Sequence, residues 1–510
     1  MRRGKIAAFA AIAVTMLMVS SPAGTATPGF KTKTPAMLSL APDAPPGSLV
    51  RPIISSGDEL GSFVFEGLPD GLGLVPNGDG TVDVYVTHEQ SHVPFRGFAD
   101  FEDASISRVS IKTSNKKVLD AETVLPPEEG FIRFCSAFMA GPAEGFEDYV
   151  FFANEESNDD LEVPADALYG PDPALDPLRE AGYAVSYDVA SGDYAPIPGM
   201  GRHNHENTVV VPGGWSETVA LSGDDTFSAP SSQLYLYSAA SPEAMLADEG
   251  TLYAFRVTGT DGTPLADPSD PFNGANDYGD ILADDDWQGE FIAVPDDIAD
   301  GTTAAEPQAG LEAWSNDNNV FQFIRVEDIA YDRNEPNVVY FADTGEARAI
   351  SDPGSGRLMR GPSGTMGPYP NGRIFRMELN PEDPTQVESF SILLDADAGG
   401  YDNPDVMHQP DNMDTSANSL MVQEDTGQAP NSRVWRYDLA TETWSVLASV
   451  NDEDWESSGI VDASSVLGAG WWFLDVQAHD IFVDEDTTTI TGVTLKREGG
   501  QLLAVRFPGT

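Results

Sequence analysis

Cysteine, lysine and positive charge are all scarce in this sequence. Cys135 is the only cysteine among 510 residues, so no disulfide can form within the chain. The 27 Lys and Arg residues, of which only 7 are Lys, face 83 Asp and Glu, for a formal net charge of −56. Such a charge repels nucleic-acid phosphates and anionic lipid headgroups. The composition therefore argues against nucleic-acid binding and against binding to a membrane surface.

Long apolar runs are scarce as well. The one such stretch, residues 6–19, follows a basic start with Arg2, Arg3 and Lys5 and precedes small residues at 23–26. It is too short to span a bilayer comfortably and no second one follows. The pattern predicts a cleaved signal peptide over residues 1–26 and a secreted or periplasmic protein without stable membrane insertion. Pro, Thr and Ala then predict a linker over residues 27–50.

Short strand-like runs dominate the remaining sequence, separated by Gly, Asp, Pro and Asn. A first type is apolar and ends in carboxylates, as in residues 82–86, 149–152, 208–211, 338–341 and 419–422. A second type places charged residues between large apolar ones, as in residues 373–379 and 433–439. Such runs predict strands with one buried face. We therefore expect an all-β protein.

The carboxylates that follow the first type of run indicate a β-propeller. In that fold the inner strands converge on one axis, so acids from distant parts of the chain surround one central pocket. We expect about six blades within residues 51–510, in a chain that is monomeric. Acidic, Pro- and Gly-rich insertions near 157–200 and 258–315 are expected to cover one face of the disc.

Histidines and acids at these strand ends suggest metal chemistry. All six histidines lie in polar segments: His88, His92, His203, His205, His408 and His479. A carboxylate-rich pocket with one thiolate suits calcium or iron better than a structural zinc site. Cys135 alone could equally be a small buried apolar residue. Sequence motifs for a serine nucleophile elbow, a P-loop or an EF-hand are absent.

Five segments in sequential order resemble the PhoX-type alkaline phosphatases. They are His88-Glu89, the cysteine segment 134–141 with the later pair 155–156, residues 201–206, residues 325–328 and residues 410–412. The resemblance covers roughly residues 60 to 480. It implies a β-propeller whose central pocket holds Fe³⁺ and Ca²⁺ and which hydrolyses small phosphate esters outside the cytoplasm.

The resemblance also implies roles for individual residues. Cys135 would ligate iron as a thiolate and act in catalysis with Arg325, which would hold the phosphoryl oxygens. The carboxylates implied as ligands of the iron–calcium cluster are Glu206, Glu327 and Asp411, with Glu89, Glu155 and Glu156 at the calcium positions. Thr87 stands where the family usually has Asn, and the family's upstream carboxylate has no assigned counterpart in this sequence.

Two other classes of function remain open from the sequence. One is a calcium-dependent phytase or lactonase-like hydrolase, which needs carboxylates but no cysteine ligand. The other is a non-catalytic calcium-binding propeller at the cell surface, in which the acids stabilise loops. Loss of Cys135 separates the first alternative from a phosphatase, and calcium-dependent stability without turnover marks the second.

Overall fold

The structure is a computed structural model. It describes residues 29–94, 98–162, 178–226, 232–302, 306–354, 356–401, 403–425, 431–490 and 493–510. The predicted signal peptide lies outside the described residues. No helix in this part of the chain combines the length and apolar character needed to cross a membrane.

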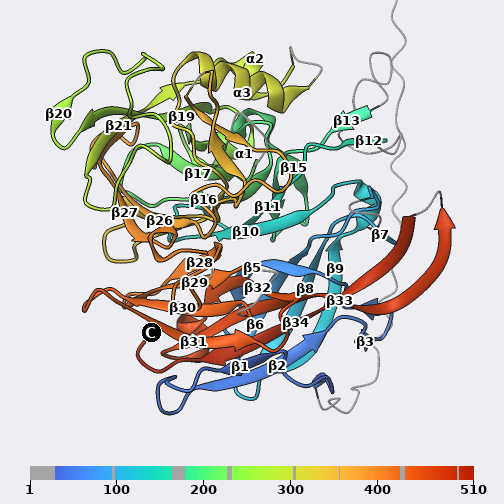
Figure 1. The fold of residues 1–510 in the computed structure, drawn as a ribbon. Coiled ribbons are helices and arrows are strands. Elements are labelled where there is room, and N and C mark those ends of the chain that lie inside the picture. Colours follow the sequence, from blue (N-terminus) through green and yellow to red (C-terminus); the bar gives the residue numbers. More distant parts are fainter. Residues whose placement is uncertain are drawn as a thin grey trace, which may run out of the picture.

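Six antiparallel blades surround one axis in the described part of the chain (Figure 1). The innermost strands of the blades are β5 (Pro69–Pro76), β10 (Phe134–Ala140), β16 (His205–Val210), β22 (Val326–Tyr331), β28 (Pro410–Thr415) and β32 (Trp455–Asp462). Each of these strands packs against the next, and β32 packs against β5. The ring is therefore closed, and the predicted β-propeller is confirmed.

The other strands of the blades follow outward in hydrogen-bonded order. Blades 1 to 3 continue with β6 (Thr81–His88), β8 (Ser105–Lys112) and β9 (Lys117–Leu125); β11 (Val150–Glu155), β14 (Ala184–Asp188) and β15 (Tyr194–Pro196); β17 (Thr218–Asp224), β18 (Leu234–Ala239) and β19 (Thr251–Thr260). Blades 4 to 6 continue with β23 (Val338–Asp343), β26 (Arg373–Leu379) and β27 (Gln386–Asp395); β29 (Ser419–Glu424), β30 (Arg433–Asp438) and β31 (Thr443–Val450); β33 (Trp471–Ile490), β34 (Val493–Arg506) and β2 (Leu49–Ser55).

Shorter elements occupy the connections. The strands among them are β1 (Leu38–Leu40), β3 (Glu59–Leu60), β4 (Phe63–Val64), β7 (Phe98–Asp100), β12 (Asp160–Glu162), β13 (Leu178–Glu180), β20 (Thr263–Pro264), β21 (Trp287–Ala293), β24 (Ala349–Ser351) and β25 (Leu358–Arg360). The α-helices are α1 (Pro242–Leu246), α2 (Asp296–Ala299), α3 (Pro307–Asp317) and α4 (Ser464–Leu467).

The N-terminal segment completes the last two blades. β1 pairs with β31 at the outer edge of blade 5, and β2 pairs with β34 at the outer edge of blade 6. Leu38 is buried beside Val450 in the same apolar cluster. The segment predicted as a linker thus contains edge strands, because a ring closes stably when the chain start is hydrogen-bonded to the blades formed last.

The strands predicted to be innermost are mostly the second strands of their blades. The runs at residues 82–86, 338–341 and 419–422 lie in β6, β23 and β29, whereas residues 208–211 largely belong to the innermost strand β16. A second strand runs antiparallel to its innermost neighbour, so it ends where that neighbour begins. The acids after the second strands therefore still reach the end of the channel where the inner strands start.

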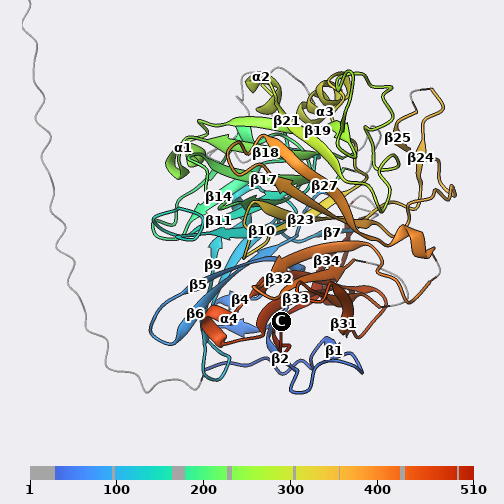
Figure 2. The same cartoon turned by 90° about the vertical axis from the view of Figure 1, so that its left-hand side faces the viewer.

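The insertion near 258–315 links two blades. Its strand β21 pairs with β19 of blade 3 and with β27 of blade 4, which joins the two blades into one sheet. Helices α2 and α3 of the same insertion lie over this half of the molecule (Figures 1 and 2). Between the two blades, Phe255, Phe323, Phe341, Phe375 and Phe390 form a buried aromatic cluster. The blades that carry Glu206 and Glu327 are thus held rigidly together.

Candidate metal centre

Each innermost strand contains a β-bulge, which lies near the start of the strand in five of the six blades. Five of them have one extra residue between their first and fourth positions, relative to the paired second strand, and β32 has its extra residue at Gly459. Gly459 has φ of 41°, and a Cβ there would lie 2.0 Å from the Asp70 carbonyl oxygen, so the close approach requires glycine. A bulge re-aims the side chains beside it. Here it turns polar side chains toward the channel.

The second residue of every innermost strand is an acid or the cysteine. These six residues are Asp70, Cys135, Glu206, Glu327, Asp411 and Glu456. Three groups of potential ligand atoms lie within 4.8 Å of one another among the described residues: Asp70, Glu89 and Cys135; Cys135, Glu156 and Glu206; and Glu206, Glu327 and Asp411. Cys135 and Glu206 each belong to two groups, so the groups form one continuous centre.

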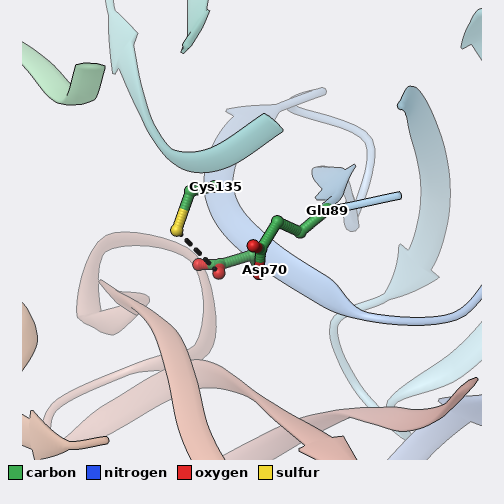
Figure 3. Close-up of side chains that lie close together, drawn as sticks. All are labelled: Asp70, Glu89 and Cys135. Carbon is green, nitrogen blue, oxygen red and sulfur yellow. Dashed lines mark hydrogen bonds between the residues drawn. The ribbon is translucent and has the colours of Figure 1, made fainter. Parts of the chain in front are cut away.

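Cys135 lies at the middle of this centre. Its Sγ is 3.3 Å from Oδ2 of Asp70, to which it donates a hydrogen bond, and 3.6 Å from Oε1 of Glu206. Figure 3 shows the side chains of Cys135 on β10, Asp70 on β5 and Glu89, which follows β6, lying close together. The Thr87 hydroxyl donates to the Cys135 carbonyl oxygen at 2.7 Å. Thr87 therefore supports the cysteine strand through the backbone.

Burial and mutual repulsion hold these groups in their protonated forms when no cation is present. Burial, followed by the charge of Glu89, raises the pKa of Asp70 to about 7. Burial and the neighbouring Glu327 raise the pKa of Glu206 well above its usual value, and burial does the same for Glu327 and Asp411. Burial with Asp70 and Glu206 also raises the pKa of the Cys135 thiol. Only bound cations could hold so many of these groups ionised at neutral pH.

The donor set fits bound cations. Oε2 of Glu206 and Oδ1 of Asp411 are buried and have no hydrogen-bond partner, which is costly unless a cation or water is bound. Several carboxylates with one thiol match hard cations such as calcium together with a thiolate-accepting metal such as iron. The residues present are therefore suited to a cluster of more than one metal ion.

Gln477 on β33 and Thr344 after β23 complete the rim of the centre. Nε2 of Gln477 donates to Oδ2 of Asp70 at 2.8 Å and to Oε2 of Glu89 at 3.1 Å. The hydroxyl of Thr344 donates to Oε1 of Glu327. These donors orient carboxylates whose remaining lone pairs are available to a cation.

Arg325 is a cation at the rim of the centre, and Asp225 holds it. Its Nε and Nη2 each lie 2.6 Å from a different oxygen of Asp225, and Nη2 is also 3.4 Å from Oε1 of Glu327. Such a two-point pair fixes the plane of the guanidinium group. The arginine side chain keeps 19% of its surface exposed, whereas that of Asp225 is fully buried. Arg325 is thus positioned at the rim of the acidic centre.

Glu155 is not brought into the groups of potential ligands. Its Oε1 accepts a hydrogen bond from the backbone N–H of Ile132 and its Oε2 accepts one from that of Tyr183. Its neighbour Glu156 does lie in the centre. The alternation of side chains along a strand explains the difference, since two consecutive residues face opposite sides.

Glu155→Gln is expected to lower the free energy of unfolding by about 1 to 3 kcal/mol, because one amide N–H of the backbone loses its acceptor. We expect the metal content per chain to stay unchanged. Thermal unfolding and elemental analysis of the purified variant measure the two effects. A loss of calcium in the folded variant would instead make Glu155 a ligand.

The histidines do not enter these groups among the described residues. His88 is buried between the Gly67 carbonyl oxygen and the Ser107 hydroxyl. The rings of His203 and His205 are tilted by 33° to each other, with centroids 3.6 Å apart. His479 contacts a ring residue, with Nε2 3.4 Å from Oε2 of Glu456. The histidine pattern was therefore a weaker guide than the acids.

Asp70 and Glu456 are the two members of the ring that the sequence analysis missed. Asp70 follows Pro69 in the same way that Asp411 follows Pro410. A polar or glycine residue also follows the ring position in all six blades: Gly71, Ser136, Asn207, Asp328, Asn412 and Ser457. This short pattern could have revealed both residues, but only after the six innermost strands were aligned with one another.

A cavity of about 240 Å³ occupies the opposite end of the channel. It is lined by later residues of the innermost strands, such as Leu74, Tyr331 and Asp414, and by Arg333 beyond β22. It extends toward the centre as far as Gly71, Ser136, Asn207 and Asp328, each of which follows a ring residue. Glu206 and Asp411, the ring acids with unpartnered oxygens, lie near the other end of the innermost strands.

The family model for alkaline phosphatase PhoX matches residues 152–451, which is more than half of the chain. The chain belongs to the PhoX alkaline phosphatase family. The match includes Glu206, Arg325, Glu327 and Asp411 of the centre, whereas Cys135 lies before it. No curated protein matches the sequence.

A solved structure from the PhoX family has a similar fold. A structure of Pseudomonas fluorescens PhoX in complex with vanadate, a transition state analogue, is similar with a TM-score of 0.64 and 15% identity, over 94% of this chain and 97% of that chain. The GH93 α-L-arabinofuranosidase of Fusarium graminearum has a TM-score of 0.39 and 7% identity, over 89% of this chain and 97% of that chain.

Proposed function

We propose that this protein is a metal-dependent phosphomonoesterase, an alkaline phosphatase that uses an iron–calcium cluster in the central pocket. The observation that carries the proposal is the convergence of Cys135, Glu206, Glu327 and Asp411, with Arg325 at the rim, inside a PhoX-family propeller. The vanadate-bound relative of the same fold adds support, since vanadate mimics the transition state of phosphoryl transfer in that protein.

Cys135 and the ring carboxylates would hold the cluster. The Cys135 thiol would bind iron as thiolate with Glu206, Glu327 and Asp411, while Asp70, Glu89 and Glu156 would bind calcium. The bound cations would polarise the phosphoryl group and stabilise the charge that develops on it. Thr344 and Gln477 would keep their carboxylate partners oriented through the hydrogen bonds described above.

Arg325 would bind the substrate phosphoryl group. Acids surround the pocket and repel an anionic ester, so affinity depends on cations at the site. A guanidinium group matches phosphoryl oxygens in geometry and charge. Asp225 would hold it in place before substrate arrives, which lowers the entropy lost on binding.

We further propose export of the protein by the N-terminal segment, and action on small phosphate esters outside the cytoplasm. The basic start and the apolar run of residues 6–19 support export. Calcium supply and the strongly acidic composition both fit an extracellular or periplasmic setting.

Hydrolysis of p-nitrophenyl phosphate tests the proposed function. The mature protein, loaded with calcium and ferric iron, is expected to turn over this ester, and Cys135→Ala is expected to lose at least a hundredfold in kcat because the cluster loses its thiolate. Release of p-nitrophenol measures the rate, and elemental analysis measures bound iron. Turnover that persists in folded Cys135→Ala would favour a calcium-only hydrolase, and no turnover by the loaded wild-type protein would contradict a phosphomonoesterase.

A further inference from the structure

One hairpin reverses the charge of this very acidic protein. Residues 347–366 contain three arginines and one aspartate, Asp352, while the whole chain has 83 acidic and 27 basic residues. The segment includes β24 and β25, which pair with each other. Figure 2 shows the hairpin standing out at the edge of the propeller. A basic element in such a setting points to an anionic ligand.

Arg357 anchors the hairpin. Its guanidinium group is buried and its Nη2 donates to the carbonyl oxygens of Val320 and Asn276. The backbone N–H of Gly367 donates to the Ala347 carbonyl oxygen at 2.7 Å and closes the base of the hairpin. These contacts fix the hairpin to the body of blades 3 and 4.

The other two arginines face one carboxylate. Nε of Arg348 and Nε of Arg360 each lie 3.6 Å from a different oxygen of Glu346. Their side chains keep 26% and 33% of their surface exposed. Arg348 and Arg360 thus stand side by side around Glu346 and remain accessible to an anion from solvent.

This pair of arginines is close in sequence to a residue that contacts the metal centre. Glu346 follows two residues after Thr344, whose hydroxyl donates to Glu327 and whose backbone N–H donates to the Arg325 carbonyl oxygen at 3.0 Å. Thr344 and Glu346 both follow the end of β23, which pairs with the start of β22 where Glu327 lies. The arginine pair therefore lies beyond the same end of blade 4 as the metal centre.

We propose that Arg348 and Arg360 form a second anion-binding subsite, and that the preferred substrates carry a second phosphate group on the alcohol portion of the ester. The inference rests on the proposed phosphomonoesterase function. In a substrate of this class, the reacting phosphoryl group binds at Arg325 and the distal phosphate binds at the exposed parts of Arg348 and Arg360, beside Glu346. A distal phosphate makes charge-assisted hydrogen bonds that a monophosphate cannot make.

Phosphonates test the subsite without any turnover, because their C–P bond is not cleaved by ester hydrolysis. Butane-1,4-bisphosphonate and hexane-1,6-bisphosphonate are compared with butylphosphonate by calorimetric titration of the calcium- and iron-loaded protein. The wild-type protein is expected to bind at least one bisphosphonate about tenfold more tightly than the monophosphonate. Arg348→Gln/Arg360→Gln is expected to lose this advantage.

A matched variant controls for general loss of positive charge. Arg376 belongs to the same blade, keeps 29% of its side chain exposed and pairs with Glu378 on β26, so Arg376→Gln should preserve the bisphosphonate advantage. An absent advantage in the wild-type protein, or one that survives in the double variant, would overturn the subsite. Hydrolysis of p-nitrophenyl phosphate is recorded separately, so that a failure of the proposed function is distinguished from a failure of the subsite.

Discussion

Arg325→Gln is expected to lower kcat/KM for p-nitrophenyl phosphate by a factor of about 10² to 10³, which is typical for removal of one group that stabilises a transition-state charge. Arg325 is the rim cation held by Asp225 through two hydrogen bonds of 2.6 Å. Arg325→Lys keeps the charge but cannot reproduce the planar two-point contact, so it should recover only part of the activity. Steady-state kinetics with metal analysis of each variant measures the effect.

Arg333 provides the matched control for Arg325. The two arginines flank the same innermost strand, β22, at opposite ends, and Arg333 pairs with Asp414 at 2.9 Å. Arg333→Gln should therefore leave kcat/KM within a factor of about two, since its position is far from the reacting group. If Arg325→Gln loses metal together with activity, the arginine has a structural role and the assigned contact with substrate is wrong.

Removal of the metal ions is expected to reverse the pH dependence of stability. In the cation-free protein the pKa of Asp70 is raised to about 7 by burial and by Glu89. A carboxyl group with a raised pKa stabilises the fold below its unfolded pKa of about 4, and this contribution is lost as the pH rises through the folded value. For Asp70 it is on the order of 4 kcal/mol. The chelated protein should therefore be more stable at pH 5 than at pH 8.5.

Bound cations should prevent this loss of folding stability at high pH. Cations replace the protons on Glu206, Glu327 and Asp411, so metal binding releases protons and strengthens as the pH rises. The difference in Tm between loaded and chelated protein is expected to widen from pH 5 to pH 8.5. Differential scanning calorimetry, with calcium and iron returned to one half of each sample, measures it. If the chelated protein is equally stable at both pH values, the buried carboxyl groups of the centre do not have raised pKa values.

Local patterns were sufficient to predict the architecture and much of the centre. Alternation of apolar and polar residues predicts strands such as β26 and β30, because one face of each must be buried. Acids at strand ends indicated that the blades meet at a polar axis. The ordered segments around Cys135, Glu206, Glu327 and Asp411 predicted four residues that the structure brings into one centre.

Other features depended on contacts between distant residues. Glu155 and Glu156 are adjacent acids that the sequence pattern does not distinguish. Their side chains point in different directions, so Glu155 binds backbone amides whereas Glu156 lies in the centre. Asp70 became a ring member because β5 closes against β32, whose sequence lies almost 400 residues later. No local pattern encodes that closure.

The sequence by itself determined that this protein is acidic and built of short strands, with a lone thiol among carboxylates, since composition and strand patterns are local properties. The resemblance to the PhoX family came from its five ordered segments. The tertiary structure alone decided which acids meet. In five blades a bulge at the start of the innermost strand turns one side chain toward the axis, and the closed ring brings these side chains together with Glu456 of the sixth blade. Their convergence depends on packing between blades, which the linear order of residues does not specify.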